Sequence, residues 1–445
     1  MLSVRNLARR LAGLVASPGP PRPPPSPPRP PSTATFQQLD PSQPIEEETV
    51  PFYDPTAFYP VRIGEVFQSR YQVVGKLGYG AYSTVWLCHD LVGHRYVSVK
   101  VCSRNSIPVK RELAALEYLN RLPKTRHGGR PHVRTLLDQF VLTSATEEPS
   151  ASSDPDSEPP ATVPPQSFQC LVHKPMLMSI FALRAIFPDK KLPETLTKLV
   201  LIHVLTAVDY LHSEAKLIHT DINENNILLD LDDARTLEAF EEAERTNPLP
   251  RKDAGDRTVY LSRDFETEPE NYGRPVLCDF GEARIGLPSK HTDLVQPDQY
   301  RAPEVILGAP WDEKVDIWTI GVMIWDMFEN KNMFKPYGGP DNKRSDLYHL
   351  AHMVALLGPP PADLLQRSTM AELWRFFDAQ GNWVGATRVP DDSLEQSESR
   401  LEGADKALFL AFVRKMVRWK PEERASAKEL LGDAWLDNHL TVSGS

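Results

Sequence analysis

The chain has 445 residues, of which 41% are hydrophobic and 25% are charged, so it can bury a full globular core. Its formal net charge is −10, and it holds no run of 18 apolar residues, which excludes a transmembrane segment. The four cysteines lie far apart without a CxxC pair, which argues against a disulfide framework or a zinc ribbon and favours a reducing compartment.

The N-terminal part is basic and rich in proline, and residues 1–57 are expected to form a disordered tail. Residues 1–16 place leucines on one helical face and arginines opposite, which is typical of a mitochondrial presequence, although an unstructured basic tail explains the pattern as well. Residues 1–39 carry five arginines and no acid, which leaves −15 on residues 40–445. An acidic body repels nucleic-acid phosphates and favours cationic partners, so no direct binding of nucleic acid is expected.

Regular structure is expected to begin near residue 58 with a small β-rich lobe that extends to about residue 173. Alternating apolar residues predict strands at Tyr71–Leu77, Thr84–Cys88, Tyr96–Val101, Val133–Val141 and Phe168–Val172, and one helix is predicted at Lys110–Leu122. Residues 143–167 contain proline, serine and five acids but no base, so they are expected to be a disordered loop.

The pattern turns helical over residues 174–440, which predicts a larger α-rich lobe. Helices are predicted from Pro193 to about Leu211 and at Val315–Phe328, Asp346–Leu357, Lys406–Trp419 and Ala427–Leu431. Residues 230–274 form an insertion, assigned to the larger lobe, with a short helix at Thr236–Arg245. Strands first and helices later indicate an α+β fold with two lobes.

A glycine-rich turn between two predicted strands reads LGYGAYSTV over Leu77–Val85. Gly78 and Gly80 allow the backbone to approach phosphate oxygens without interference from a Cβ atom, and Ser83 stands where a third glycine often lies. Many hairpins contain two nearby glycines, so this motif gains its weight only from the motifs that follow it.

A strand ending in lysine follows, with the sequence VSVK over Val97–Lys100. Lys100 can neutralise the α- and β-phosphates of ATP if an acid holds it in place, and Glu112 in the next helix is the natural candidate. In isolation, an ordinary surface Lys and Glu explain these two residues equally well.

Two further motifs supply acids and an amide. His219–Asn226 reads HTDINENN, in which Asp221 would orient an incoming hydroxyl and accept its proton while Asn226 would bind Mg²⁺. His219 is expected to be a packing residue rather than a base. Cys278–Gly281 reads CDFG, in which Asp279 would chelate the Mg²⁺ that bridges the phosphates of ATP.

Three charged residues complete the set of motifs. Glu304, in RAPE, and Arg424 are expected to pair and to clamp the substrate-binding segment to the larger lobe. Asp316, in VDIW, is expected to accept hydrogen bonds from the backbone of the HTD loop. Each one alone could be a surface charge, but six pieces in this order indicate a protein-kinase fold.

With these residues in place, the chain resembles a eukaryotic protein kinase of the CMGC group, and within it a divergent, fungal-type member of the SR-protein kinase family. The resemblance covers about residues 58–440 and is closest in Tyr59–Asp90, His219–Leu229 (HTDINENNILL) and Gln299–Val305 (QYRAPEV). It implies that ATP contacts the following residues: Leu77, Gly78, Tyr79, Gly80, Ala81, Tyr82, Ser83, Thr84, Val85, Lys100, Glu112, Lys174 and Met176.

The resemblance further implies an ATP- and Mg²⁺-dependent serine/threonine kinase that phosphorylates serine beside arginine in Arg/Ser-rich proteins such as splicing factors. It implies a monomer in the cytoplasm and nucleus, with mitochondria as the alternative that residues 1–16 suggest. The acidic body agrees with a basic substrate, although surface acids also serve solubility.

Three residues depart from the family pattern. Asn223 replaces the lysine expected two residues after Asp221, and Pro297 replaces a threonine that would contact this lysine. The loss of a cation near the γ-phosphate can cost a few orders of magnitude in rate. The alternative hypothesis is therefore a nucleotide-binding pseudokinase that acts as a scaffold. His173, where a residue beside the adenine is expected, is also unusual.

Thr220 leads to a separate hypothesis about activation. Many kinases carry an arginine at this position that binds a phosphate on the activation segment, and threonine cannot do so. Residues 282–300 show no cluster of cations for such a phosphate. Activity is therefore expected without phosphorylation of the activation segment.

Overall fold

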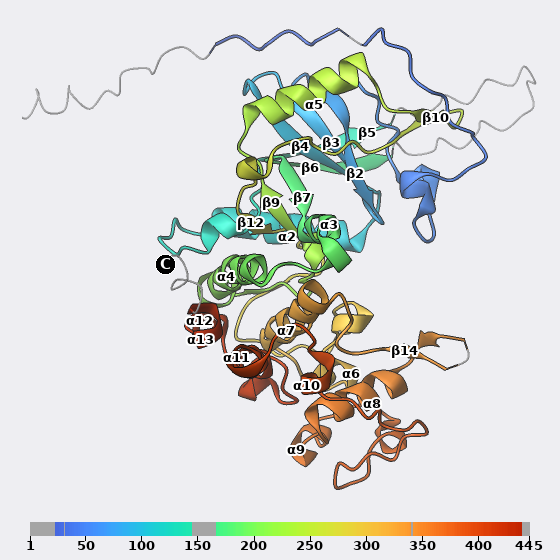
Figure 1. The fold of residues 1–445 in the computed structure, drawn as a ribbon. Helices are drawn as coiled ribbons and strands as arrows, with labels where there is room; N and C mark the ends of the chain where they lie inside the picture. Colours follow the sequence, from blue (N-terminus) through green and yellow to red (C-terminus); the bar gives the residue numbers. More distant parts are fainter. Residues whose placement is uncertain (1–22, 31, 145–165, 340, 438–445) are drawn as a thin grey trace, which may run out of the picture.

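The strands predicted between residues 71 and 173 form one antiparallel sheet in the computed structural model, which describes residues 23–30, 32–144, 166–339 and 341–437. The order of its strands is β1-β2-β3-β4-β6-β5. Their bounds are β1 Val66–Phe67, β2 Tyr71–Gly80, β3 Ser83–Asp90, β4 Arg95–Cys102, β5 Asp138–Thr143 and β6 Ser167–His173. One helix, α2 (Ile107–Arg121), packs beside this sheet (Figure 1). The expected disordered loop, residues 143–167, lies largely outside the described residues.

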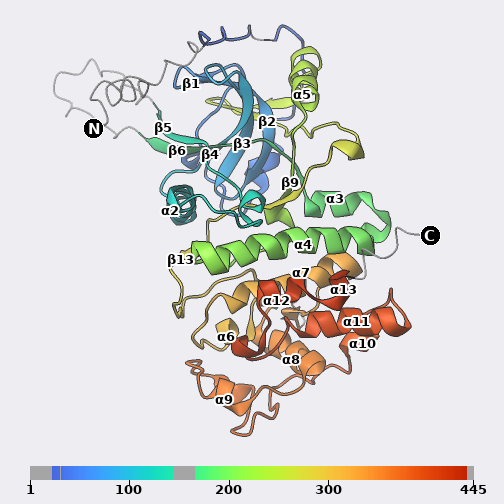
Figure 2. The same ribbon diagram turned by 90° about the vertical axis from the view of Figure 1, so that its left-hand side faces the viewer.

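Helices make up most of the larger lobe below the sheet, so the expected α+β fold with two lobes is confirmed (Figures 1 and 2). Their bounds are α3 Ile180–Ile186, α4 Glu194–Tyr210, α6 Pro303–Ile306, α7 Lys314–Glu329, α8 Asp346–Leu357, α9 Ala362–Leu365, α10 Leu394–Ser397, α11 Gly403–Arg414, α12 Ala427–Leu431 and α13 Ala434–Asp437. Two short hairpin strands, β14 (Tyr337–Gly338) and β15 (Lys343–Arg344), lie at its edge.

Helix α7 is the centre of the larger lobe. Every residue from Val315 to Glu329 is buried, and Trp318 and Trp325 are among the largest side chains that the solvent does not reach. A helix that is apolar on all sides is stable only inside a core, because each face must be covered. The polar residues of α7 must therefore find partners inside the protein.

A small sheet at the junction of the lobes connects the segments that carry the HTD and DFG motifs. It has the order β12-β9-β7, with β7 at Met176–Ser179, β9 at Ile227–Asp230 and β12 at Pro275–Leu277. A second pair joins β8 (Leu217–Ile218) to β13 (Arg284–Ile285). These two pairings place residues on either side of 221 and 279 next to one another, although they are far apart in the sequence.

Residues 23–57 were expected to belong to a disordered tail, and the structure contradicts this for the part that it describes. The segment runs along the small lobe and forms short 3₁₀ turns at Glu46–Thr49 and Pro55–Ala57. Its contacts explain the order: Gln72 binds the backbone of Arg29, and Arg104 binds Thr56. Residues 1–22, which include the presequence pattern, lie outside the described residues.

The insertion at residues 230–274 packs against the small lobe, not the larger lobe to which it was assigned. Its predicted helix is present as α5 (Ala234–Thr246), which covers one side of the sheet (Figure 2). Gly75 of β2 makes this packing possible, because a Cβ atom there would lie 2.9 Å from the Phe240 ring. Two short strands follow, β10 (Arg251–Asp253) and β11 (Thr258–Tyr260).

Several element boundaries differ from the sequence prediction. The strand expected from Val133 begins only at Asp138, because Val133 bridges to Leu277 at the lobe junction instead. Pro193 caps α4 rather than opening it, and α11 ends at Arg414 rather than at Trp419. Within the described part of the chain, no helix combines the length and apolarity that crossing a membrane requires.

Candidate active site

Lys100, Glu112 and Asp279 meet at the junction of the sheet, helix α2 and the DFG segment. Lys100 Nζ lies 2.7 Å from Glu112 Oε2 and 3.6 Å from Asp279 Oδ2. Burial alone would lower the pKa of Lys100, but the two carboxylates raise it above its ordinary value. Lys100 in turn lowers the pKa of Asp279, so both groups are charged at neutral pH.

The glycine-rich turn at the end of β2 lies above this cluster. Gly78 pairs with Val85 and Gly80 with Ser83 across the hairpin. Among the described residues, a Cβ atom at Gly78 would meet no atom within 4 Å, and one at Gly80 would meet only Ser83 Oγ, at 4.0 Å. The protein itself therefore does not require glycine at either position, which fits a turn that closes over a bound group.

The side chains at the edge of the hairpin differ in exposure. Tyr79, Ala81 and Tyr82 are exposed, whereas Ser83 and Thr84 are buried in the sheet, where Thr84 accepts a hydrogen bond from Trp86 Nε1. Among the expected ATP contacts, Ser83 and Thr84 are therefore available through their backbone only. Leu77 and Val85 are half-buried.

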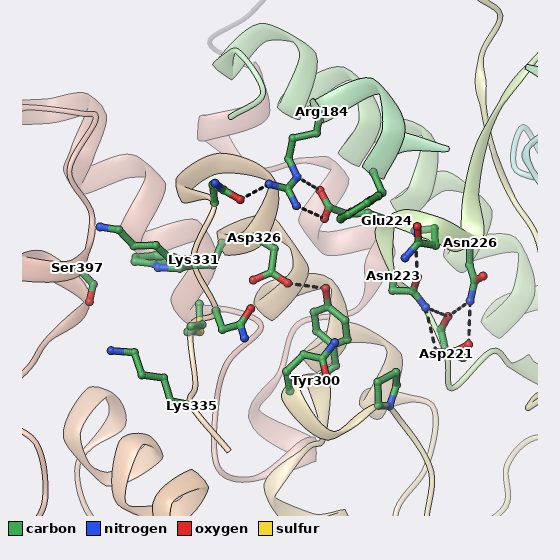
Figure 3. Close-up of a pocket in the computed structure, with 18 of the residues that line it drawn as sticks. Arg184, Asp221, Asn223, Glu224, Asn226, Tyr300, Asp326, Lys331, Lys335 and Ser397 are labelled. Carbon is green, nitrogen blue, oxygen red and sulfur yellow. Dashed lines mark hydrogen bonds and ion pairs between the residues drawn. The ribbon is translucent and has the colours of Figure 1, made fainter. Parts of the chain in front are cut away.

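Asp221 is held by two amides of its own loop (Figure 3). Asn226 Nδ2 donates to Asp221 Oδ2 at 2.8 Å, and Asn223 Nδ2 donates to Asp221 Oδ1 at 3.0 Å. Burial and the nearby negative charge of Asp279 nevertheless raise the pKa of Asp221 to about 6. A carboxylate with such a pKa is a suitable proton acceptor near neutral pH.

The pairing of β9 with β12 brings Asn226 and Asp279 to the same side of the cleft. Cys278 N donates to Asn226 O at 2.8 Å, and His219 Nε2 lies 3.0 Å from Cys278 O. His219 is fully buried and packs on the Phe280 ring, which confirms its expected packing role. The HTD and DFG segments therefore converge, as the sequence predicts.

Asp316 of α7 holds the HTD loop from below. Its carboxylate accepts hydrogen bonds from His219 N at 2.9 Å and Thr220 N at 2.7 Å, and His212 Nε2 lies 2.8 Å away. Thr220 has a φ of +67°, a conformation that costs energy for a β-branched residue and needs such support. These contacts fix the backbone that carries Asp221.

Two oxygen ligands for a divalent metal ion are available. Asn226 uses its amide hydrogens for Asp221, which leaves its Oδ1 oxygen for another partner, and Asp279 is half-exposed. Amide and carboxylate oxygens suit Mg²⁺, which usually takes its remaining ligands from phosphates and water. The described residues contain no group of three or more His, Cys, Asp or Glu that could hold a metal without such help.

The expected adenine contacts lie where β6 leads into β7. The Lys174 side chain binds Asp230 at 3.0 Å and Asp232 at 3.3 Å, so its side chain is committed to these carboxylates. Met176 pairs with Asp230 in the small sheet. His173 is buried, with Nδ1 at 2.8 Å from Thr135 O, and its Nε2 finds no partner among the residues that the structure describes.

A cavity of about 890 Å³ is lined by Asp221, Asn223 and Asn226 of the HTD loop (Figure 3). It reaches Asp326 of α7, whose Oδ2 accepts a hydrogen bond from Tyr300 while Oδ1 has no hydrogen-bond partner in the part of the chain that the structure describes. Burial raises the pKa of Asp326 to about 7. Lys331 and Lys335 lie at the other end of the cavity. Sequence reasoning missed this set, although an acid within the apolar helix α7 was a possible signal.

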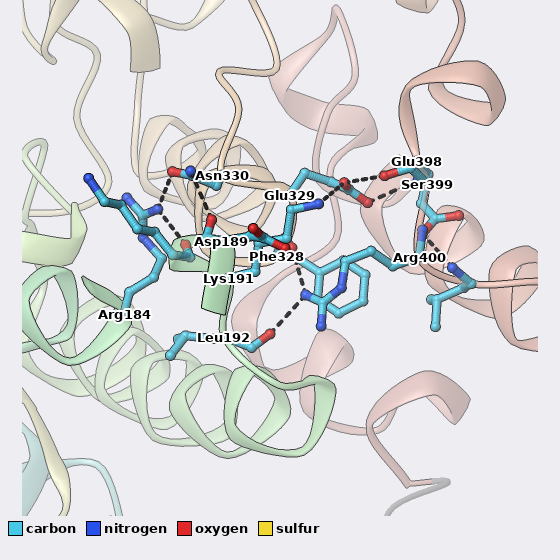
Figure 4. Close-up of polar contacts among 12 residues, drawn as sticks. Arg184, Asp189, Lys191, Leu192, Phe328, Glu329, Asn330, Glu398, Ser399 and Arg400 are labelled. Atoms are coloured by element: carbon cyan, nitrogen blue, oxygen red, sulfur yellow. Dashed lines mark hydrogen bonds and ion pairs between the residues drawn. The ribbon is translucent and has the colours of Figure 1, made fainter. Parts of the chain in front are cut away.

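Arg184 of α3 is a second residue that the sequence did not indicate. It forms a two-point ion pair with Glu224, in the HTD loop, and also donates to Asn330 Oδ1 after α7. Figure 4 shows the contact between Arg184 and Asn330 beside a second group of polar contacts, in which Glu329 accepts hydrogen bonds from Ser399. Arg184 therefore links three segments that form the wall of the cavity.

The remaining predicted pair, Glu304 and Arg424, is present as a fully buried ion pair at the start of α6. The structure thus brings together Lys100, Glu112, Asp279, Asn226 and Asp221 in one cluster, and Asp316 holds the loop that carries Asp221. Such a cluster, built from a β-rich lobe and an α-rich lobe, defines a protein kinase by geometry.

Comparison with known proteins agrees with this class. Residues 71–436 match the protein kinase domain family, and the chain belongs to that family. A serine/threonine protein kinase of Aspergillus fumigatus is 45% identical over 94% of this chain and 96% of its own length. The chain is a serine/threonine protein kinase, a divergent one of the SR-protein kinase type.

More distant relatives support the same group. The serine/threonine-protein kinase SRPK of Physarum polycephalum is 30% identical over 87% of this chain and 90% of its own length. SRSF protein kinase 3 of Mus musculus is 25% identical over 90% of this chain and 92% of its own length. A crystal structure of a kinase domain shares the fold, with a TM-score of 0.61 at 20% identity over 86% of this chain and all of that chain.

Proposed function

We propose that this kinase transfers the γ-phosphoryl group of ATP to serine in basic, Arg/Ser-rich proteins. The observation that carries the proposal is the convergence of Lys100, Glu112, Asp279, Asn226 and Asp221 in one cluster. Phosphoryl transfer needs little more from a protein than positioning and electrostatic stabilisation, and these residues supply both.

Each residue has a distinct role in this proposal. Lys100, held by Glu112, binds the α- and β-phosphates, while the glycine-rich turn covers them. Asp279 and Asn226 Oδ1 hold Mg²⁺, which offsets the charge of the phosphates when it is bound. Asp221 orients the serine hydroxyl and accepts its proton, because the raised pKa keeps the carboxylate basic enough at neutral pH.

The cavity in front of Asp221 supports a basic substrate. Asp326 lines this cavity as a buried carboxylate, and its Oδ1 has no hydrogen-bond partner among the described residues, so a guanidinium or ammonium group would suit it. Lys331 and Lys335 at the far end carry the opposite charge. We therefore expect a basic side chain to be accepted close to the phosphorylated serine and disfavoured at the lysine end.

We further propose that the kinase acts as a monomer, in the cytoplasm and nucleus. The names SRPK and SRSF protein kinase 3 among the relatives support the assignment of the substrate class. The presequence pattern of residues 1–16 keeps mitochondria as the alternative to be tested by imaging of the full-length chain.

The decisive experiment is transfer of radiolabelled phosphate from ATP to an Arg-Ser repeat peptide, with Asp221→Ala and Lys100→Met as controls. Transfer by the wild type that both variants abolish supports the kinase. Equal and negligible incorporation in all three would favour the pseudokinase scaffold instead. A peptide in which lysine or glutamine replaces arginine measures how far the substrate preference depends on the guanidinium group.

A further inference from the structure

Lys76 of β2 is a fully buried lysine directly before the glycine-rich turn. Its side chain has no exposure to solvent, and its Nζ contacts Glu47, lies 3.4 Å from Glu46 Oε2 and donates to Tyr260 O at 2.9 Å. A buried ammonium group is tolerated only when carboxylates and carbonyl oxygens surround it, because its desolvation is costly. These three contacts therefore determine where the Lys76 side chain lies.

The partners of Lys76 come from two segments outside the sheet. Glu46 and Glu47 belong to the N-terminal extension, here defined as residues 23–57, and Tyr260 ends strand β11 of the insertion. The two segments also bind each other, because Glu46 accepts hydrogen bonds from Ser262 N at 3.0 Å and Ser262 Oγ at 2.6 Å. They form one support on the outside of the small lobe, in the region of β10 in Figure 1.

This support reaches the glycine-rich turn directly. Lys76 Nζ lies 5.4 Å from the centre of the Tyr79 ring, and Tyr79 stands between the two glycines of the turn. The pairing of β2 with β3 also shifts register between Lys76 and Gly78, where a bulge redirects the strand. The insertion also contacts strand β2 at the residue before Lys76, because Phe240 of α5 packs on Gly75.

We propose that Lys76 is a positioning residue for nucleotide binding, through which the N-terminal extension and the insertion hold the glycine-rich turn over the phosphates of ATP. The inference rests on the proposed ATP-dependent function and goes beyond it, because it assigns a role to segments outside the catalytic cleft. Loss of the Glu46–Glu47–Lys76 contacts frees the end of β2, so nucleotide binding weakens while the groups that carry out the transfer stay in place.

A matched pair of variants tests this role. Lys76→Met is compared with Lys252→Met, because Lys252 is also a fully buried lysine that pairs with the extension, through Glu48 and Gln43 O, but lies on β10 instead of β2. We expect both variants to unfold at lower temperature than the wild type. Only Lys76→Met should raise the KM for ATP and the Kd for Mg-ADP, by about fivefold or more, with kcat within about twofold of wild type.

Equal changes of Kd and KM in the two variants, or none in either, would overturn the inference. Should Lys76→Met fail to fold, Glu47→Gln serves as the second variant against Glu48→Gln, with the same expected contrast in Kd. The Kd for Mg-ADP also separates the two proposals. A wild type that binds nucleotide but transfers no phosphate would refute the proposed function, and the Kd of the variants would still decide the role of Lys76.

Discussion

Arg424 and Glu304 form a two-point ion pair in the core of the larger lobe, although 120 residues separate them in the sequence. Both bonds, from Nη1 to Oε1 and from Nη2 to Oε2, measure 2.6 Å, and neither side chain is exposed. Arg424 also donates to the carbonyl oxygens of Arg418 and Lys314, so its guanidinium joins three segments around α6.

Arg424→Met should lower the free energy of unfolding by about 3–5 kcal/mol, because it leaves the Glu304 carboxylate buried without a partner. Chemical denaturation measures the loss. Arg414→Met is the control, since the Arg414–Glu395 pair is roughly half-exposed and its loss should stay within about 0.5 kcal/mol. Similar values for the two variants would contradict the structural role of the pair.

Asp221→Asn should abolish phosphoryl transfer and yet stabilise the protein. The pKa of Asp221 is about 6 in the folded protein against an ordinary value of 3.8, so the charged carboxylate is unfavourable in the fold. The gain from asparagine should be present above about pH 6 and vanish below about pH 4, where both states carry the proton. We expect a rise in Tm of roughly 2–4 °C at pH 7.5.

Asp279→Asn is the matched control for this prediction. Lys100 lowers the pKa of Asp279, so its charge stabilises the fold, and the variant should lose activity together with stability at pH 7.5. The two aspartates thus should give Tm changes of opposite sign. A fall in Tm for Asp221→Asn at that pH would show that the charged Asp221 carboxylate does not destabilise the folded protein.

The rate of transfer should depend on pH through Asp221. The carboxylate must be unprotonated to accept the hydroxyl proton, so kcat/KM should fall as the pH drops below about 6. Asp279, with its lowered pKa, remains charged over this range, so its titration should not change kcat/KM there. A rate that is flat from pH 5 to pH 8 would contradict the assignment of Asp221 as proton acceptor.

Asn223→Lys, made together with Pro297→Thr, should raise kcat by about tenfold or more. The two residues line the same cavity as Asp221, and a lysine at position 223 would place a cation where charge develops on the transferred group. Asn223→Gln lengthens the side chain without charge and serves as the control. An unchanged kcat in the double variant would show that the chain compensates for the missing cation elsewhere.

Treatment of the pure enzyme with phosphatase should leave its activity within about twofold of the untreated enzyme. Residues of the activation segment are already held without phosphate: Thr220 Oγ donates to Glu282 O at 2.7 Å, and Arg111 pairs with Glu282 at 2.7 Å. Arg284 pairs with Asp293 further along the segment. Loss of activity on treatment, with recovery after rephosphorylation, would contradict this expectation.

The motifs predicted much of the site, because the chemistry of phosphate and metal binding allows few residue types. Lys100, Glu112, Asp221, Asn226 and Asp279 could be named from their order in the chain, and the structure places them together. Periodic apolar residues likewise predicted the sheet and the main helices. The class of protein was therefore determined by the sequence alone.

Only the tertiary structure decided how the remaining segments are used. The extension looked disordered because it belongs to a basic, proline-rich tail, and its order depends on contacts with Lys76, Lys252 and Gln72 that no local pattern contains. The insertion packs on the small lobe because Gly75 admits Phe240, a fit that depends on shape. The proposed role of Asp326 in binding a basic side chain depends on its burial beside the cavity. This cavity forms only when segments that are distant in the sequence fold together.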